Sequence, residues 1–236
     1  MTAVLTPLPW DEEHLGFPCA RLDWDPAPPE NARDLTAEIV RALDLAATTA
    51  LVAAKLPTGL CDPSALASAL PGWRVRALGV EVLHRRPAGD PGSVHSAEVS
   101  FVSGTAAPAP FLPLAHDMRY SRYHLDPEIG TERAVSLWQA SIAEHCRGFA
   151  HEVADLTQAG RPAGMATLHI DSDSVRLHIV GVLAWARGQG LGRRLLEAVI
   201  ARHGRTRDVL VEAHQDNAGA TALYRAFRED TRFSGS

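Results

Sequence analysis

The stretch Arg-Gly-Gln-Gly-Leu-Gly at residues 187–192 constrains the fold of this chain more than any other part of the sequence. Glycine in a helix interior costs about 1 kcal/mol relative to alanine, so Gly188, Gly190 and Gly192 predict a turn. An apolar run precedes this turn, and an amphipathic run over 191–204 follows it. The chain is therefore expected to pass from a buried strand, through bare backbone, into the N-terminus of a helix.

A helix N-terminus preceded by glycines is suited to bind an anion. The first turn of a helix exposes unpaired N–H groups and carries about half a positive charge, and glycines remove the Cβ atoms that would obstruct an anion. Arg187, Arg193 and Arg194 add positive charge. The stretch predicts a cradle for a phosphate group, most naturally a diphosphate. A glycine-rich turn without a ligand is the alternative.

Two other phosphate-binding motifs are excluded by spacing. The pattern is G-x-G-x-G rather than G-x-G-x-x-G, and no acidic residue follows about 20 positions later at the end of a second strand. No G-K-[ST] is present, which excludes a P-loop. A dinucleotide-dependent oxidoreductase is therefore disfavoured.

Length and charge narrow the class of protein. The 236 residues allow one larger domain or two small ones, and a formal net charge of −5 argues against a general nucleic-acid binder. Cys19, Cys61 and Cys146 lie far apart, so a reduced, cytoplasmic chain is expected. The start has no basic region followed by an apolar run, and no stretch approaches 18 apolar residues, so neither a signal peptide nor a membrane partner is expected.

Patterning predicts an α+β chain in two parts. In residues 1–94, expected to be a small α/β unit, helices are predicted over 34–46 and 62–70 and strands over 49–56 and 73–85. Residues 85–93 and 103–113, rich in proline and glycine, are predicted to be loops. In residues 95–236 the predicted strands are 97–104, 148–155, 163–171, 174–184 and 208–214, with a hairpin turn at 159–162, and the predicted helices are 113–123, 131–146, 191–204 and 218–227.

Two motifs in the second part resemble a known family. Residues 187–192 resemble the R/Q-x-x-G-x-G/A signature of the GNAT N-acetyltransferases, and Asn217 to Tyr224 resembles their N-x-x-A-x-x-L-Y element. The resemblance covers roughly 95–236 and implies a mixed central sheet flanked by helices. It also implies acetyl-CoA as co-substrate and no metal. The family's glycine after the L-Y pair is missing, so the last strands are expected to be trimmed or supplied from elsewhere.

A narrower resemblance covers nearly the whole chain. The opening "LPWDEEHLGFPCARL" and the element Ser121–Asp126, followed by Trp138, resemble bacterial sugar-nucleotide N-acetyltransferases of the TDP-fucosamine acetyltransferase type. This implies acetylation of a nucleotide-linked amino-deoxy sugar, of the TDP-4-amino-4,6-dideoxyhexose type, with the first unit contributing to the acceptor site. Another small amine, a protein N-terminus or a non-catalytic acyl-CoA-binding module are the alternatives. A homodimer is among the assemblies expected.

The GNAT resemblance implies roles for particular residues. The N–H groups of Gly188, Gly190, Gly192 and Arg193, with Arg187 beside them, would hold the pyrophosphate. Val180 and Val182 would pair with the pantetheine arm through the main chain, and an N–H near Val180 would face the thioester oxygen. Asn217 would cap its helix, bond the cofactor arm, or do both.

Tyr224 is the candidate general acid, since a phenol of pKa about 10 can protonate a departing thiolate. A tyrosine packed at a helix end is the alternative. Period-two alternation places Arg176, His178, Val180 and Val182 on one strand face, which makes His178 a candidate base. Glu81 and an ordered water chain are the other candidates for that role.

For the acceptor, Arg122 could pair with a diphosphate, and Tyr123 or Trp10 could stack on a base or sugar. A surface ion pair and core aromatics are the alternatives. The remaining cluster in the sequence follows no metal-ligand spacing, so no metal site is expected there. It consists of His145, Cys146, His151 and Glu152.

Overall fold

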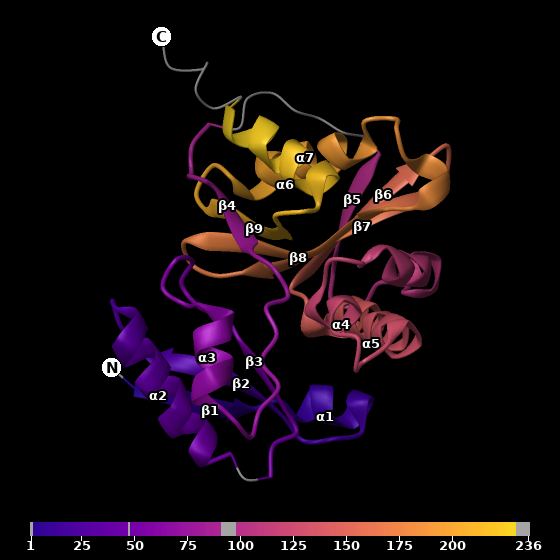
Figure 1. Ribbon diagram of the computed structural model, residues 1–236. Coiled ribbons are helices and arrows are strands. Elements are labelled where there is room, and N and C mark those ends of the chain that lie inside the picture. Colours follow the sequence, from indigo (N-terminus) through magenta and orange to yellow (C-terminus); the bar gives the residue numbers. More distant parts are fainter. Residues whose placement is uncertain (1, 47, 91–97, 230–236) are drawn as a thin grey trace. The chain divides into compact units, whose positions relative to one another are not determined.

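The computed structural model describes residues 2–46, 48–90 and 98–229. The chain forms two compact units, Met1–Leu78 and Gly79–Ser236, each with its own sheet. Figure 1 shows both sheets and the helices that pack on them. Within the described ranges, none of the helices has the length and apolar character needed to cross a membrane.

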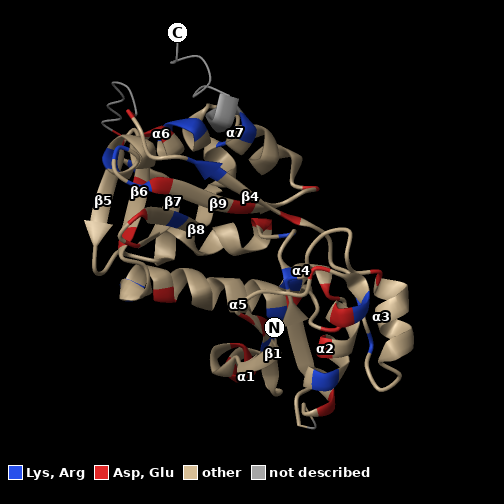
Figure 2. Ribbon diagram, turned by 90° about the vertical axis from the view of Figure 1, so that its left-hand side faces the viewer, with Lys and Arg blue, Asp and Glu red and all other residues tan. Residues whose placement is uncertain are grey.

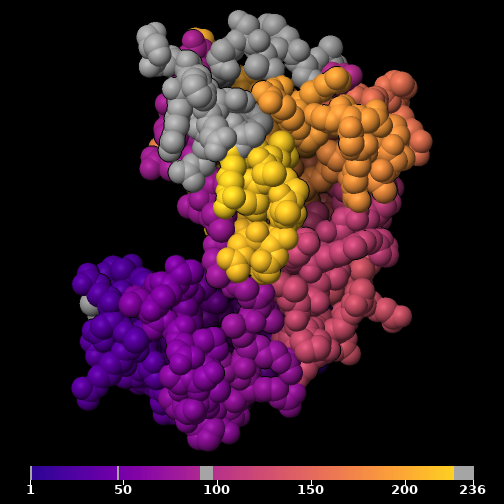
Figure 3. Space-filling view, turned by 45° about the horizontal axis from the view of Figure 1, so that its top comes forward, coloured from indigo at the N-terminus to yellow at the C-terminus, as the bar shows by residue number. Residues whose placement is uncertain are grey.

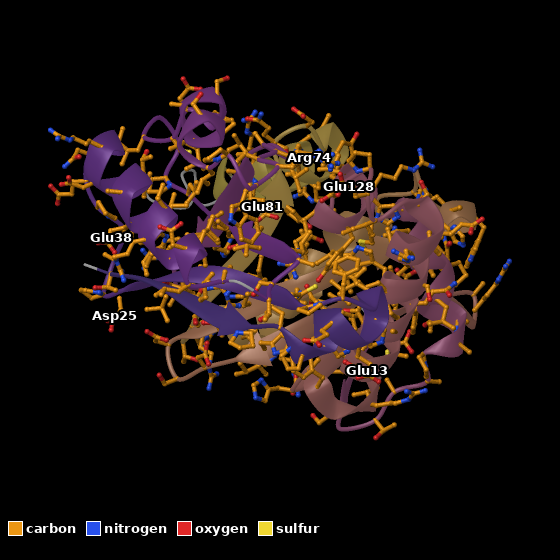
Figure 4. All side chains as sticks on the ribbon, turned by 60° about the horizontal axis from the view of Figure 1, so that its bottom comes forward. Glu13, Asp25, Glu38, Arg74, Glu81 and Glu128 are labelled. Carbon is orange, nitrogen blue, oxygen red and sulfur yellow. The ribbon has the colours of Figure 1, made fainter. Side chains whose placement is uncertain are left out.

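The N-terminal unit is built on a three-stranded sheet in the order β1-β2-β3. β1 runs antiparallel to β2, and β2 runs parallel to β3. Asn31 caps α2 by accepting the N–H of Asp34, and Asp62 caps α3 by accepting the N–H of Ser64. Figure 4 labels Asp25 at the end of β2 and Glu38 on α2. The elements are β1 (Thr2–Pro7), α1 (Pro9–Leu15), β2 (Cys19–Asp25), α2 (Ala32–Asp44), β3 (Leu51–Ala54) and α3 (Pro63–Ala69).

The C-terminal unit is built on a six-stranded mixed sheet in the order β4-β9-β8-β7-β6-β5. Only the β8–β9 pair is parallel; the other neighbours are antiparallel. The predicted turn at 159–162 joins β6 to β7, with Ala159 and Gly160 at positive φ. The strands are β4 (Glu81–Arg86), β5 (Val99–Ser103), β6 (Glu152–Gln158), β7 (Arg161–Ile170), β8 (Ser174–Val182) and β9 (Asp208–His214).

Helices cover both faces of this sheet. α6 and α7 lie on one face, whereas α4, α5 and the 3₁₀ helix η1 lie on the other (Figure 1). Leu195 and Val199 belong to the core under α6, and Phe111 and Ile142 to the core under η1 and α5. The predicted mixed sheet flanked by helices is confirmed. These elements are η1 (Ala109–Asp117), α4 (Arg122–Leu125), α5 (Thr131–Glu144), the π-helical turn η2 (His145–Phe149), the 3₁₀ turn η3 (Ala184–Ala186), α6 (Leu191–His203) and α7 (Ala218–Glu229).

The boundary between the units lies earlier than the sequence suggests. The expected boundary after residue 94 falls in 91–97, outside the described residues. The strand β4, expected in the first unit, pairs with β9 from Glu81 opposite His214 to Arg86 opposite Val209. Ladder hydrogen bonds thus make β4 part of the second unit, which begins at Gly79. β4, which comes from an earlier part of the sequence, is therefore the outer neighbour of β9. The GNAT resemblance led us to expect further strands after Tyr224 instead. The last seven residues, 230–236, lie outside the described part.

Two predicted elements differ from the structure for local reasons. Instead of one helix over 113–123, the chain forms η1 and the short α4. Pro110 and Pro113 lack an N–H, and Ser121 caps a new helix by accepting the N–H of His124. The strand predicted over 148–155 begins only at Glu152, because Gly148 at φ 110° follows α5 in a π turn.

Candidate functional site

The two parallel strands at the centre of the sheet separate before they end. β8 pairs with β9 from Ser174 opposite Asp208 to Leu177 opposite Val211. Both strands then continue, β8 to Val182 and β9 to His214, and within the described residues no further pairing joins them. The carboxyl-terminal halves therefore leave two strand edges facing an opening in the sheet.

A β-bulge changes the direction of the side chains at this point. Leu168 pairs with Leu177 and Ala166 with Val180, so Thr167 alone opposes two residues of β8. The buried Thr167 hydroxyl accepts the N–H of Ile179 at 3.0 Å. A bulge shifts the alternation by one residue, because side chains alternate with period two.

The predicted shared face is therefore wrong. Leu177, before the bulge, packs in the core under α6. Val180 and Val182, after the bulge, pack against the same core. His178 lies on the opposite face of the sheet, with Ile179 buried in the core under η1 and α5. The alternation assumed from the sequence holds up to His178 and breaks at Ile179.

The exposed edge of β8 presents main-chain groups to the opening. The N–H of Leu183 donates to the carbonyl of Ala163 at 2.8 Å, so Leu183 is bonded to β7. In an antiparallel ladder, alternate residues point their N–H and C=O groups away from the partner strand. Val182 and Val180 thus direct these groups away from β7, and the carbonyl of Val182 accepts from Nε of Arg187 at 3.0 Å.

The glycine loop lies at the end of this edge and opens α6. Gly188 and Gly190 have φ of +76° and +72°, and a Cβ built at either position would meet nothing within 4 Å. Gly190 precedes α6, whose first amides have no partner inside the helix. A Cβ on Gly192 would lie 3.7 Å from Val182 and 3.4 Å from Leu223 of α7, which places the helix start beside β8. The predicted strand–turn–helix passage is confirmed.

The arginines around this loop are paired with carboxylates. Arg187 bonds Asp117, Arg193 bonds Glu197 at 2.7 Å, and Arg194 bonds Glu98 at 2.7 Å. Exposed ion pairs of this kind contribute about 0–1 kcal/mol, so an anionic ligand can replace them. Asn217 caps α7 by accepting the N–H of Ala220 at 3.2 Å, as one of its two predicted roles requires. The main-chain amides of this loop are therefore the part of the predicted cradle that does not depend on these ion pairs.

Tyr224 lies on the α6 and α7 face of the sheet. Its residue is 6% exposed and lines an apolar pocket with Leu196, Val211 and His84, whose ring centroid is 5.3 Å from that of Tyr224. Burial raises the pKa of Tyr224 to about 12, so the phenol keeps its proton at neutral pH. Figure 3 shows α7, in yellow, at the surface of the unit.

Titratable side chains gather on the other face, where β8 and β9 have separated. His178 and Glu212 are the first residues beyond the last pair, and Glu212 is 3.6 Å from Arg176. Glu81, labelled in Figure 4, pairs with His214 at the end of β9. Sequence reasoning missed Glu212 and His214; their position at the carboxyl end of a predicted strand was the available signal.

His178 is surrounded by other imidazoles. His178 is an exposed residue, yet desolvation of its imidazole lowers its pKa to about 4, with further lowering from the nearby His145 and His169. Its ring centroid is 4.8 Å from that of His145 and 5.7 Å from that of His169. His178 is consequently neutral at physiological pH but only a weak base.

The predicted acceptor residues are engaged in local contacts. Arg122 donates to the Tyr123 hydroxyl at 2.5 Å and lies 4.6 Å over its ring. Tyr123 is 8% exposed and meets Trp138 edge-on, which leaves little of its ring free to stack on a base. Trp10 belongs to the N-terminal unit, where it stacks on His14 at 4.2 Å, and its role at the acceptor stays a prediction.

The residues that cluster in sequence around His145 separate in space. Glu152 bonds Arg202 and His203, and His151 accepts the N–H of Ile170. Burial raises the pKa of the Cys146 thiol to about 11, so it remains protonated. His145 instead meets His169 and His178, two residues far away in sequence.

A divided parallel strand pair beside a glycine turn and a helix N-terminus defines the class of this unit. The model of the acetyltransferase (GNAT) family matches residues 115–227, from η1 through α7. The C-terminal unit has the GNAT fold. No curated protein matches the sequence.

Solved structures are similar at low identity. A functionally unknown conserved protein from Staphylococcus epidermidis ATCC 12228 aligns with 94% of this chain and 84% of its own, at 17% identity and a TM-score of 0.58. That likeness in fold extends over both units. A tandem GNAT protein from the clavulanic acid biosynthesis pathway covers 89% of this chain and 71% of its own, at 22% identity and a TM-score of 0.48. The ribosomal-protein-S18-alanine N-acetyltransferase from Escherichia coli covers 55% and 76%, at 26% identity and a TM-score of 0.38.

Proposed function

We propose that the C-terminal unit is an acetyl-CoA-dependent N-acetyltransferase. The observation that carries this proposal is the separation of β8 from β9 after Leu177 and Val211, next to the glycine loop that opens α6. An extended amide chain such as pantetheine can pair with an exposed strand edge in the way an added strand does. Its pyrophosphate then meets the amides at the N-terminus of α6. The β8 edge is thus complementary to the pantetheine arm of the co-substrate, and the first amides of α6 are complementary to its pyrophosphate.

The main chain of β8 supplies the groups for binding. Val180 and Val182 direct their N–H and C=O groups into the opening, and Arg187, which bonds the Val182 carbonyl, would release it to the pantetheine. The N–H of Val180 is suited to hold the thioester oxygen as negative charge develops there. The side chains at these positions serve packing, since both belong to the α6 and α7 core.

The reaction needs an acid and a base on either side of the thioester. A neutral amine attacks the carbonyl carbon, a C–N bond forms, the amine proton leaves to a base, and the C–S bond then breaks to expel the CoA thiolate. We assign protonation of that thiolate to Tyr224, on the α6 and α7 face. The base is sought on the opposite face, among His178, Glu81 and ordered water. This separation keeps the two proton transfers apart.

The acceptor class rests on the narrower sequence resemblance. We propose a nucleotide-linked amino-deoxy sugar of the TDP-4-amino-4,6-dideoxyhexose type, with a cytoplasmic location and Arg122 meeting the diphosphate. The described part of the C-terminal unit mixes acidic and basic side chains (Figure 2), which is compatible with a small acceptor. Carboxylates close to the opening, Glu212 and Glu81, suit the approach of a cationic amine.

A CoA-release assay tests the proposal. The purified chain is given acetyl-CoA with TDP- and UDP-linked 3-amino and 4-amino deoxy sugars, and with polyamines, aminoglycosides and an N-terminal peptide for comparison. Turnover confined to one sugar nucleotide supports both the reaction and the acceptor. Turnover only with unlinked amines or the peptide keeps the acetyltransferase and overturns the acceptor. Tight acetyl-CoA binding without any turnover contradicts the enzyme and favours a non-catalytic acyl-CoA-binding module.

A further inference from the structure

Three histidines from three elements meet on the α5 face of the sheet. His145 begins the turn after α5, His169 lies on β7 and His178 lies at the bulge of β8. One ring nitrogen from each lies within 4.8 Å of the other two. The sequence separates them by up to 33 positions, which is why no metal-ligand spacing reveals them.

Two ring nitrogens of the cluster are buried without a hydrogen-bond partner in the described part of the chain. His145 is 3% exposed, and its Nδ1 lies 2.8 Å from the carbonyl of Ser141. A carbonyl only accepts, so Nδ1 carries the proton and Nε2 presents a lone pair. Within the described part of the chain, Nε2 of His145 and Nε2 of His169 are buried without a hydrogen-bond partner. A buried acceptor left in this state is destabilising, and a bound cation would satisfy it.

We propose that His145, His169 and His178 bind a divalent transition-metal ion, with Zn²⁺ as the best match. Three imidazoles are a common zinc ligand set, and Zn–N bonds of about 2.0–2.1 Å place tetrahedral ligand nitrogens about 3.4 Å apart. Metal binding would require side-chain rotation to bring the three nitrogens, now within 4.8 Å of one another, to this spacing. The bond from His145 Nδ1–H to the Ser141 carbonyl is the type of outer contact that fixes the ring of a zinc ligand.

Charged side chains around the cluster act in both directions. Glu144 and Glu212 act electrostatically on His145 and His178, respectively, and favour a cation there, whereas Arg176 opposes it. Asp171 acts on His169 in the same sense as the two glutamates. The ion would tie η2, β7 and β8 together at the bulge. It would also occupy a nitrogen of His178, so metal binding and a base role for that nitrogen exclude each other.

The test uses the full chain freed of metal by a chelator. Zn²⁺ is titrated by calorimetry and Co²⁺ by its visible d–d absorption, whose intensity reports four-coordinate geometry. We expect one ion per chain, a higher melting temperature with Zn²⁺, and binding weakened at least ~100-fold in both His169→Gln and His178→Gln. His116→Gln replaces an exposed histidine of η1 outside the cluster and should leave binding unchanged.

The melting temperature of each metal-free variant shows that it is folded. Absence of Zn²⁺ and Co²⁺ binding in the wild type overturns the proposal, as does binding that survives in His169→Gln and His178→Gln. Neither result bears on acetyl transfer, because none of these measurements uses acetyl-CoA. The proposal of a metal site and the proposal of acetyltransferase activity are therefore tested independently.

Discussion

At the scale of single residues, Tyr224 carries the sharpest chemical assignment. Its hydroxyl is protonated at neutral pH and lies on the face of the sheet opposite the candidate bases. Replacement by phenylalanine keeps the ring that packs beside His84 and removes only the proton donor. We expect Tyr224→Phe to lower kcat about 100-fold or more while the affinity for acetyl-CoA stays nearly constant.

Steady-state kinetics and calorimetric titration of acetyl-CoA check this expectation. Tyr120→Phe serves as the control, because Tyr120 is 39% exposed and lies on η1's side of the unit, stacked on His214. An unchanged kcat in Tyr224→Phe would leave Tyr224 as a packing residue only. A large loss of acetyl-CoA affinity would likewise remove it from the acid role.

Gly190 tests the phosphate cradle. Its φ of +72° penalises any side chain by about 1–2 kcal/mol, and its missing Cβ faces open space. Gly190→Val should therefore lose some stability and, through steric obstruction, weaken acetyl-CoA binding at least about 10-fold. Calorimetry and thermal melting measure the two effects.

A matched control separates backbone strain from obstruction. Gly160, in the β6–β7 turn, has a φ of +75° and also has nothing within 4 Å of a built Cβ. Gly160→Val should show a similar loss of stability with acetyl-CoA affinity intact. If both variants bind acetyl-CoA equally well, the cradle is not at Gly190.

At the scale of elements, the bulge in β8 decides which side chains face which core. The N–H of Ile179 donates a hydrogen bond to the hydroxyl of Thr167, and both residues are buried. Thr167→Val leaves that N–H unsatisfied and should reduce the free energy of unfolding by about 1–3 kcal/mol. Urea unfolding measures it. Thr167→Ser keeps the hydroxyl and should retain more of the stability. Equal stability of the valine and serine variants would show that the hydrogen bond from Ile179 to Thr167 does not stabilise the bulge.

The bulge also marks where prediction from sequence stops. Hydrophobic periodicity gave α6, β9 and the strand–turn–helix passage, because these elements have strong local patterns and the glycines permit few conformations. The same periodicity misplaced Val180 and Val182, since a bulge inserts one residue without any signal in composition.

Long-range pairing accounts for the other differences. Residues 73–85 read as a strand of the first unit, yet Glu81–Arg86 pairs with β9 more than 120 positions away, as the contact of Arg85 with Asp208 illustrates. The meeting of His145, His169 and His178 depends equally on tertiary packing. Local sequence patterns indicate neither the β4–β9 pairing nor the meeting of the three histidines.

At the scale of the whole molecule, one ion-pair cluster ties a helix to the sheet and makes stability depend on pH. Glu152 of β6 accepts from Arg202 of α6 at 2.8 and 2.9 Å and lies 2.9 Å from Nε2 of His203. The hydrogen bonds from Arg202 hold the pKa of Glu152 below its ordinary value of 4.5. The carboxylate's stabilising contribution is present above pH 4.5 and is lost as the pH falls through the lower, folded-state pKa.

Glu152→Gln should therefore lower the free energy of unfolding by about 2 kcal/mol at pH 7 and flatten its decline below pH 4.5. Urea unfolding across a pH series checks both parts. The exposed pair of Arg41 with Glu38 provides the comparison, because Glu38→Gln should have a much smaller effect. Equal pH profiles for wild type and Glu152→Gln would show that this cluster contributes nothing to acid stability.

The central claim is that acetyl-CoA binds along the exposed edge of β8. Val180→Pro removes the N–H that points into the opening and leaves the side of β8 that bonds β7 intact. The most direct measurement is a calorimetric titration of acetyl-CoA into this variant beside Val180→Ala, which keeps the N–H, with melting temperatures recorded for both. We predict binding at least about 10-fold weaker in Val180→Pro than in Val180→Ala at comparable melting temperatures. Equal affinities in two folded variants would contradict binding at this edge.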